Sequence, residues 1–174
     1  VSGSTFVNAD CFDVFPFIED KSIDAIICDL PYGTTQNKWD SVLPLNLIWE
    51  QYKRIIKDNG AIVLTASQPF TTKLISSNYE MFRYEWIYSK TKGTGFLNAN
   101  KMPMKQHENI LIFYKKLPTY NPIEVFVGIK DKRKTFNPAK LKESNIYNNA
   151  GIKNTVYHKK DNGWQMPKSI IHSK

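Results

Sequence analysis

The amino-acid sequence predicts an α/β fold: a mostly parallel sheet with an antiparallel hairpin at one edge, plus an irregular basic insertion. An apolar strand, an amphipathic helix and a second apolar strand follow one another within residues 23–66, the pattern of a right-handed parallel crossover. Two further strand patterns, at 82–88 and 108–114, are joined by one loop and are expected to pair as a hairpin. A length of 174 residues indicates one domain with an insertion.

The composition is that of a globular protein with its own core. Hydrophobic residues make up 41% of the chain, and no apolar run approaches the length of a membrane span. The amino terminus carries no charged-then-apolar targeting pattern, so we expect a cytoplasmic protein without a membrane partner. Cys11 and Cys28 lack the spacing of metal ligands, which favours free thiols in a reducing compartment.

The two halves of the chain carry opposite net charge. Residues 1–87 contain 7 Lys/Arg and 11 Asp/Glu, a net charge of −4, whereas residues 88–174 contain 17 and 5, a net charge of +12. This separation of sign predicts a catalytic half and a polyanion-binding half. A purely solubilising surface is the alternative interpretation.

The first elements lead to the most informative stretch of the chain. Residues 5–8 favour a short strand, and Asp10 then suits the cap of a short helix through Phe17. Residues 23–28 are apolar and β-branched, which predicts a strand buried on both faces. A proline and a glycine within residues 29–33 stop this strand.

A helix, a strand and a second helix follow. Pro44 suits a first helical position, and Asn59-Gly60 is a typical helix end. Residues 61–66 then form a second buried strand, and a helix is expected over 69–77, which Gln68 either starts or leaves free to touch a ligand. One face of the first helix is apolar at i, i+3, i+4 spacing: Leu45, Ile48, Trp49, Tyr52, Ile55 and Ile56.

The chemistry of the sequence is concentrated in Asp29–Gly33, at the carboxyl end of the first buried strand, where open α/β sheets bind ligands. An ionised carboxylate only accepts hydrogen bonds, and a proline holds the carbonyls around it rigidly. A tyrosine ring offers a face on which a base can stack. Together these groups suit a planar group that bears an amine, such as adenine or cytosine.

These residues also resemble a known motif. Asp29-Leu30-Pro31-Tyr32 is similar to the Asp-Pro-Pro-Tyr motif of the amino-group DNA methyltransferases, with Leu30 in place of the first proline. The resemblance implies a Rossmann-like methyltransferase sheet, S-adenosylmethionine as cofactor, and a base flipped out of double-stranded DNA. It assigns the two amine protons to Asp29 and the Leu30 backbone carbonyl, and stacking on the base to Tyr32. Since the family's cytosine enzymes usually begin the motif with serine, Asp29 favours adenine N6 over cytosine N4.

The resemblance extends to an earlier segment that would contact the cofactor. The family has Gly-Asp-Cys where this chain has Ala9-Asp10-Cys11. It implies that Asp10 and Cys11, together with Asp29, contact S-adenosylmethionine, the first two at its adenine end. A plain helix cap is the alternative for Asp10, and the two roles are compatible.

Two loops are predicted to contact DNA. Lys38 and Trp39 lie in the polar loop 34–41, which either closes on the base or simply packs down around the tryptophan. The loop 91–103 is rich in Gly, Asn and Lys, and its family equivalent lies beside the base pocket; a flexible hairpin tip is the alternative. From this second loop the predicted contacts to the base or its phosphates are Asn98, Asn100 and Lys101.

The second half of the chain has little periodicity. We expect residues 1–115 to form a partial catalytic core, 116–165 a basic target-recognition region, and 166–174 a return toward the core. In the recognition region Lys132, Arg133 and Lys134 are expected to neutralise DNA phosphates.

The order of the motifs resembles the permuted class in which the catalytic motif precedes the recognition region. That class continues into a glycine-rich Phe-x-Gly-x-Gly segment for the methionine part of the cofactor, which these 174 residues lack. We therefore expect these residues alone to bind the cofactor weakly or not at all. A DNA-binding fragment without catalysis is the alternative, and cytosine N4, a restriction–modification setting and a homodimer remain open. No metal site is expected, because His107-Glu108 has no second ligand cluster.

Overall fold

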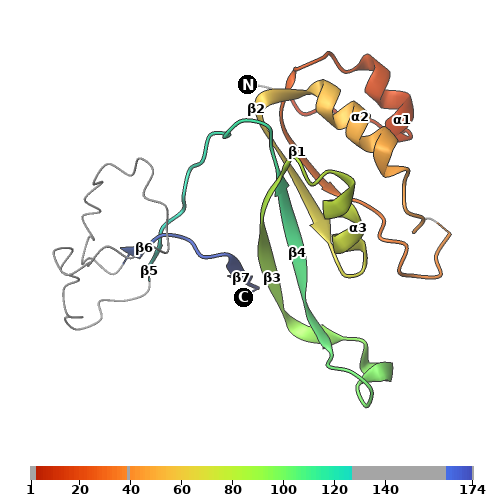
Figure 1. Cartoon of the computed structure of the whole chain (residues 1–174), viewed down its shortest axis with the longest axis vertical. Coiled ribbons are helices and arrows are strands. Elements are labelled where there is room, and N and C mark those ends of the chain that lie inside the picture. The colour runs from red at the N-terminus through yellow and green to blue at the C-terminus, as the bar shows by residue number, and fades with distance from the viewer. Residues whose placement is uncertain (1–2, 39, 127–163, 174) are drawn as a thin grey trace. The chain divides into compact units, whose positions relative to one another are not determined.

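The computed structural model describes residues 3–38, 40–126 and 164–173 (Figure 1). The chain divides into two compact units, one formed by Val1–Tyr120 with Lys168–Lys174 and the other by Asn121–Pro167. The described part of the second unit holds two short antiparallel strands, β5 (Val125–Phe126) and β6 (Trp164–Gln165). The remaining elements belong to the first unit.

The first unit is built on a five-stranded sheet with the order β1-β2-β4-β3-β7. Its strands are β1 (Ile23–Asp29), β2 (Ile56–Ala66), β3 (Phe82–Thr94), β4 (Lys105–Phe113) and β7 (Ile170–His172). The β1–β2 and β3–β7 pairs are parallel, and β4 is antiparallel to both β2 and β3. Among the described strands of this sheet only β4 therefore runs the opposite way, which confirms an α/β fold with a mostly parallel sheet and an antiparallel hairpin. β7 lies outside β3, so the hairpin is not the outermost part of the sheet.

Three α-helices and a 3₁₀ turn precede β3 in the described part of the chain. α1 (Cys11–Val14) begins at Asp10, whose carboxylate accepts a 2.8 Å hydrogen bond from the Phe12 N–H, and leads into the 3₁₀ turn η1 (Phe15–Phe17). The cap predicted for Asp10 is thus confirmed. α2 (Leu45–Ile55) and α3 (Phe70–Ser77) occupy the two predicted helical segments.

The predicted end of α2 at Asn59-Gly60 is wrong. The helix ends at Ile55, and β2 begins at Ile56, which pairs with Ile23 of β1. Gly60 lies within the strand, where a β-carbon would come within 2.8 Å of the Asp24 carbonyl oxygen. The glycine therefore permits a close approach between β1 and β2 instead of ending a helix.

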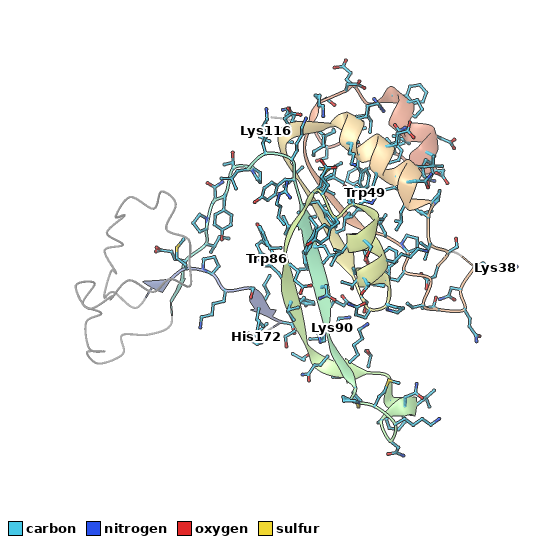
Figure 2. All side chains as sticks on the ribbon, in the orientation of Figure 1. Lys38, Trp49, Trp86, Lys90, Lys116 and His172 are labelled. Carbon is cyan, nitrogen blue, oxygen red and sulfur yellow. The ribbon has the colours of Figure 1, made fainter. Side chains whose placement is uncertain are left out.

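The core lies between α2, α3 and one face of the sheet. Trp49 packs on Phe113 of β4 at a ring-centroid distance of 4.9 Å, and its indole N–H donates a 2.7 Å hydrogen bond to Ser77 at the end of α3 (Figure 2). The predicted apolar face of α2 is buried: Leu45, Ile48, Trp49, Tyr52 and Ile55. Burial of each such side chain stabilises the fold by about 1.5–3 kcal/mol, so this face fixes α2 on the sheet.

Two predictions for the first elements are wrong. β1 is not buried on both faces: Ile27 is 79% exposed, because β1 is an edge strand and only one of its faces packs on the core in the part of the chain that is described. Residues 5–8 form no strand, and Phe6 is 94% exposed. A strand needs a neighbour with which to pair, and the described residues offer none to this segment.

Candidate functional site

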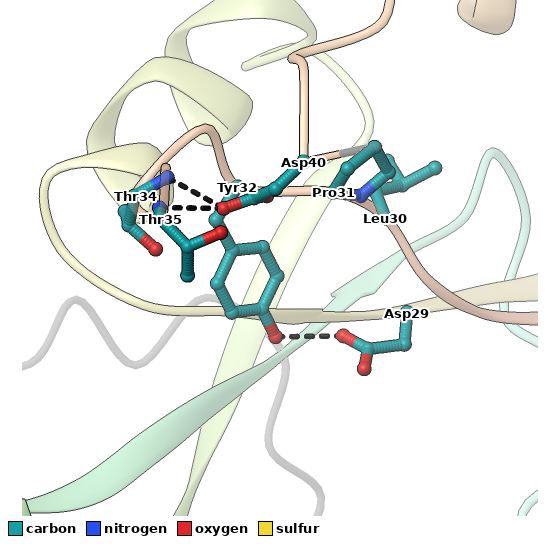
Figure 3. Close-up of a pocket in the computed structure, with 7 residues that line it drawn as sticks. All are labelled: Asp29, Leu30, Pro31, Tyr32, Thr34, Thr35 and Asp40. Atoms are coloured by element: carbon teal, nitrogen blue, oxygen red, sulfur yellow. Dashed lines mark hydrogen bonds between the residues drawn. The ribbon is translucent and has the colours of Figure 1, made fainter. Parts of the chain in front are cut away.

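The candidate site begins with Asp29, the last residue of β1, which pairs with Thr65 near the end of β2. The Asp29 carboxylate is exposed and accepts a 2.8 Å hydrogen bond from the Tyr32 hydroxyl (Figure 3). It also accepts a hydrogen bond from the Thr65 hydroxyl. Both bonds end on the same oxygen, Oδ1. Oδ2 accepts no hydrogen bond from the described residues, so the carboxylate is held by one oxygen and presents the other.

The Tyr32 ring is fixed at both of its ends. Its hydroxyl is bonded to Asp29, and one face of the ring stacks on Phe70 of α3 at 5.3 Å between centroids with a 22° interplanar angle. Burial raises the pKa of the Tyr32 hydroxyl well above its usual value; a hydrogen bond with Thr65 lowers this pKa in part, and the hydrogen bond to Asp29 and its charge raise it. The hydroxyl therefore stays protonated and remains a donor to Asp29 at any physiological pH.

An open cavity of about 310 Å³ lies beside these groups. Leu30 is 5% exposed and belongs to the core, so it anchors the motif while its neighbours face the cavity. The lining comes from the motif and from the loop after it: Asp29, Leu30, Pro31, Tyr32, Thr34, Thr35 and Asp40 (Figure 3). The structure thus brings together all four residues predicted as catalytic.

Asp40 organises this loop, a role that the sequence analysis missed. Its buried carboxylate accepts hydrogen bonds from the backbone N–H groups of Gly33, Thr34 and Thr35, at 2.8, 2.9 and 2.6 Å. A hydrogen bond from the Thr35 side chain and then these backbone groups lower the pKa of Asp40 to about 2. Gly33 has φ +67° and a β-carbon there would lie 2.8 Å from Val42, so the turn requires glycine. The signal available in the sequence was an acid closing a loop of glycine and threonines.

The residues predicted to contact the cofactor, Asp10 and Cys11, are exposed at the start of α1. Burial is the main cause that raises the pKa of the Cys11 thiol. The negative charge of Asp10 raises this pKa further, and Cys28 adds a smaller increase. One oxygen of Asp10 caps the helix, and the carboxylate retains capacity to accept further hydrogen bonds.

Of the residues predicted to contact DNA, those that the structure describes do not line the cavity. Lys38 is exposed in the loop that borders it, and the nearby Trp39 lies outside the described residues. Asn98, Asn100 and Lys101 are exposed at the turn between β3 and β4 and do not line the cavity in the described structure. The remaining three, Lys132, Arg133 and Lys134, lie outside the described residues.

The described residues show neither a metal site nor a membrane-spanning helix. No three His, Cys, Asp or Glu side chains gather there as metal ligands would. None of the described helices is long and apolar enough to cross a membrane.

A family model described as DNA methylase, of the N6/N4 type, matches residues 23–173. The chain belongs to the N6/N4 DNA methylase family. The matched region contains the whole Asp29–Tyr32 motif and the loop closed by Asp40, whereas Asp10 and Cys11 precede it. No curated protein matches the chain.

Several solved structures are similar to the chain. M1.HpyAVI in complex with SAM is 18% identical with a TM-score of 0.49, over 76% of this chain and 62% of the other. PvuII DNA methyltransferase, described as cytosine-N4-specific, is 10% identical with a TM-score of 0.48, over 68% of this chain and 50% of the other. TTHA0409 from Thermus thermophilus, a putative DNA modification methylase complexed with S-adenosyl-L-methionine, is 14% identical with a TM-score of 0.47, over 66% and 56%. The chain thus spans about three fifths or less of the length of these proteins.

Proposed function

We propose that this chain carries the base-binding site of an S-adenosylmethionine-dependent DNA methyltransferase, which methylates N6 of an adenine flipped out of double-stranded DNA. One observation carries the proposal: the exposed Asp29 carboxylate is held through Oδ1 at the sheet edge, with Oδ2 open beside a cavity of about 310 Å³. Membership of the N6/N4 family supplies the reaction class.

The fixed carboxylate has a direct chemical use. An exocyclic amine carries two N–H donors, and the proposal gives one to Oδ2 of Asp29 and the other to the backbone carbonyl of Leu30, which Pro31 holds rigid. Hydrogen bonds to both protons draw the nitrogen lone pair out of conjugation with the ring and make the nitrogen a better nucleophile. Since an ionised carboxylate accepts but does not donate, Asp29 favours an amine over a carbonyl at this position.

Tyr32 orients the base. Phe70 covers one face of the tyrosine ring, so a flipped base is expected on the other, where stacking contributes about 1–3 kcal/mol. The hydrogen bond from the hydroxyl to Asp29 couples the position of the ring to that of the carboxylate. The base plane and the acceptor that reads its amine are thereby set by a single side chain.

The proposed cofactor contacts are Asp10, Cys11 and Asp29. The fit rests on the exposed side chains of Asp10 and Cys11 at the start of α1 and on the exposed Asp29 carboxylate. When bound, S-adenosylmethionine supplies an electrophilic methyl group on sulfur. The chain's own residues bind and orient the acceptor amine and take up hydrogen bonds from its protons.

The DNA partner is expected to lie on the basic part of the chain. Residues 88–174 carry 17 Lys/Arg and 5 Asp/Glu, and phosphate contacts by Lys38, Lys132, Arg133 and Lys134 belong to this proposal. So do the assignment of 116–165 as a target-recognition region and weak cofactor binding by these 174 residues alone. Cytosine N4 is the second candidate, because the family includes both amines.

The test is the identity of the product. The full-length gene product is incubated with unmethylated double-stranded DNA and S-adenosylmethionine labelled on the methyl group, and the DNA is digested to nucleosides. We expect the label in N6-methyladenine. Label in N4-methylcytosine would replace the adenine assignment, and DNA without label would end the proposal.

A further inference from the structure

The turn between β3 and β4 carries two apolar side chains that are largely exposed to solvent. Phe96 is 78% exposed and Leu97 92% exposed, and both lie in the 3₁₀ turn η2 (Phe96–Asn98). Met102 and Met104, which follow, are 59% and 44% exposed. Apolar side chains gathered at one exposed point are a typical mark of a surface that binds a partner.

This hairpin tip, defined as residues 94–105, has a fixed internal structure. The Asn98 N–H donates a 2.9 Å hydrogen bond to the Gly95 carbonyl, and the Lys101 N–H donates one of 2.8 Å to the Asn98 carbonyl. Gly95 has φ +88°, a conformation that favours glycine, and so turns the chain out of β3. Phe96 and Leu97 are thus presented by a bonded turn.

The strand register places the tip at the same edge of the sheet as Asp29. Asp29 pairs with Thr65, Thr65 with Ile110, and Ile110 with Trp86, so one row crosses the sheet from β1 to β3. β3 continues from Trp86 to Thr94, eight residues further in the direction in which β1 ends, which is about 26 Å at 3.3 Å per residue. Figure 1 shows this hairpin extending beyond the rest of the sheet. DNA that presents a base to Asp29 must lie beyond the same edge.

The charge around the tip specifies the partner. Residues 90–105 contain four lysines and no Asp or Glu: Lys90, Lys92, Lys101 and Lys105. Lys90, labelled in Figure 2, pairs with Glu108, and Lys105 reaches the Gln68 carbonyl at 3.3 Å, whereas Lys92 and Lys101 are exposed. Apolar side chains beside unopposed cations fit a partner in which phosphates and stacked apolar rings are neighbours, which is a nucleic-acid duplex.

We propose that Phe96 and Leu97 insert into the base stack of the bound DNA duplex, while Lys92 and Lys101 contact phosphates. Inserted apolar side chains unstack a base step and bend the duplex, which costs free energy. This cost is smaller in DNA that is already unpaired. The proposal rests on the proposed function for the nature of the partner, but it requires no methyl transfer.

The experiment compares two fluorescently labelled duplexes of equal length and sequence context, one fully paired and one with a central three-nucleotide mismatch bubble. Binding of the full-length protein is followed by anisotropy. We expect the wild type to prefer the bubble by at least about tenfold, since unstacking a step costs a few kcal/mol. Phe96→Ser/Leu97→Ser is expected to lose about tenfold of that preference, because the variant has no apolar side chains to insert and retains only the part that base flipping contributes.

Two controls make the result specific. Tyr79→Ser removes a side chain that is 74% exposed near the opposite end of β3, and it should leave the preference unchanged. Lys101→Gln should weaken both complexes equally and reduce the salt dependence of binding by about one phosphate contact. An unchanged preference in the double variant would overturn the proposal. A difference in oligomeric state between the wild type and the double variant, measured by light scattering, would also overturn it, because the tip would then bind a second copy of the chain.

The same comparison is made in an Asp29→Ala background, because a flipped base would also favour unpaired DNA. A tip-dependent preference that survives there supports insertion even if the protein transfers no methyl group. If the protein methylates DNA but the tip substitution leaves the preference unchanged, the proposed function stands and the insertion is rejected.

Discussion

The Tyr32 hydroxyl donates a 2.8 Å hydrogen bond to Oδ1 of Asp29, three residues earlier in the same motif. Thr65 of the neighbouring strand donates to the same oxygen. One oxygen of the carboxylate is therefore engaged by the protein, and the other is left for a ligand. A carboxylate free to rotate would lose side-chain entropy on binding an amine, and these two bonds remove much of that cost in advance.

Removal of the Tyr32 hydroxyl should therefore slow catalysis more than it weakens binding. Tyr32→Phe keeps the ring on Phe70 and removes only the bond to Asp29. A hydrogen bond to a charged acceptor contributes about 1.5–3 kcal/mol, so we expect kcat to fall between about tenfold and about 150-fold. Steady-state kinetics on unmethylated DNA measure this, and an equal rise in KM with an unchanged kcat would show that the hydroxyl serves binding alone.

The loop after the motif should loosen when Asp40 is changed to Asn. The carboxylate accepts three backbone N–H groups, whereas an amide offers one oxygen and turns its NH₂ toward donors. We expect faster hydrogen exchange at Gly33, Thr34 and Thr35, with exchange in β2 and β4 unchanged. Exchange that stays slow at these three amides would show that the turn holds itself without Asp40.

The same carboxylate should make stability depend on pH in acid. The folded protein lowers the pKa of Asp40 from 3.8 to about 2, chiefly through hydrogen bonds from Thr35 and Gly33. A lowered pKa adds stability above pH 3.8, and this contribution is lost as the pH falls toward 2. The difference in unfolding free energy between wild type and Asp40→Asn should thus shrink from about pH 4 down to about pH 2. A constant difference across this interval would contradict the assignment.

Lysine at position 54 should make the protein less stable than arginine does. Its guanidinium donates hydrogen bonds to the Phe15 carbonyl at 2.7 Å and the Ile18 carbonyl at 2.8 Å, and pairs with Asp20. It thereby ties the segment after α1 to α2. Lysine has no planar fork, and lost hydrogen bonds to a charged group cost about 1.5–3 kcal/mol each, so we expect Arg54→Lys to lower the unfolding free energy by about that amount.

A matched control for Arg54 is the exposed ion pair between Lys57 and Asp24. Lys57→Ala should change the unfolding free energy by no more than about 1 kcal/mol, because exposed pairs contribute little. Chemical denaturation of both variants decides the matter. Equal effects would mean that Arg54 acts only as a surface charge.

The sequence was informative wherever one periodic pattern decided the outcome. The apolar face from Leu45 to Ile55 predicted α2, and the parallel crossover that places Asp29 at the sheet edge followed from it. Patterns that depend on distant neighbours failed. Ile27 belongs to a strand whose burial is set by its place in the sheet order, which no local pattern contains.

The candidate site shows the same contrast between features carried by adjacent residues and features that depend on distant ones. The motif could be singled out because its chemistry is carried by four adjacent residues, and the structure shows these residues lining the cavity. The role of Asp40 was not, since an acid in a polar loop has no periodicity and its three partners are backbone N–H groups. The isolated exposure of Phe96 and Leu97 likewise follows from the length of β3 and not from local composition.

The central claim is that Asp29 presents an acceptor to an amine, and single-turnover methyl transfer by the full-length gene product tests it most directly. Asp29→Ala removes the acceptor, and Asp29→Asn keeps its shape while turning a donor toward the cavity. We predict that both variants still bind unmethylated DNA through its phosphates and transfer the methyl group at least about 100-fold more slowly, the scale of losing one key hydrogen-bonding group in a transition state. Transfer at the wild-type rate by either variant would contradict the role given to Asp29.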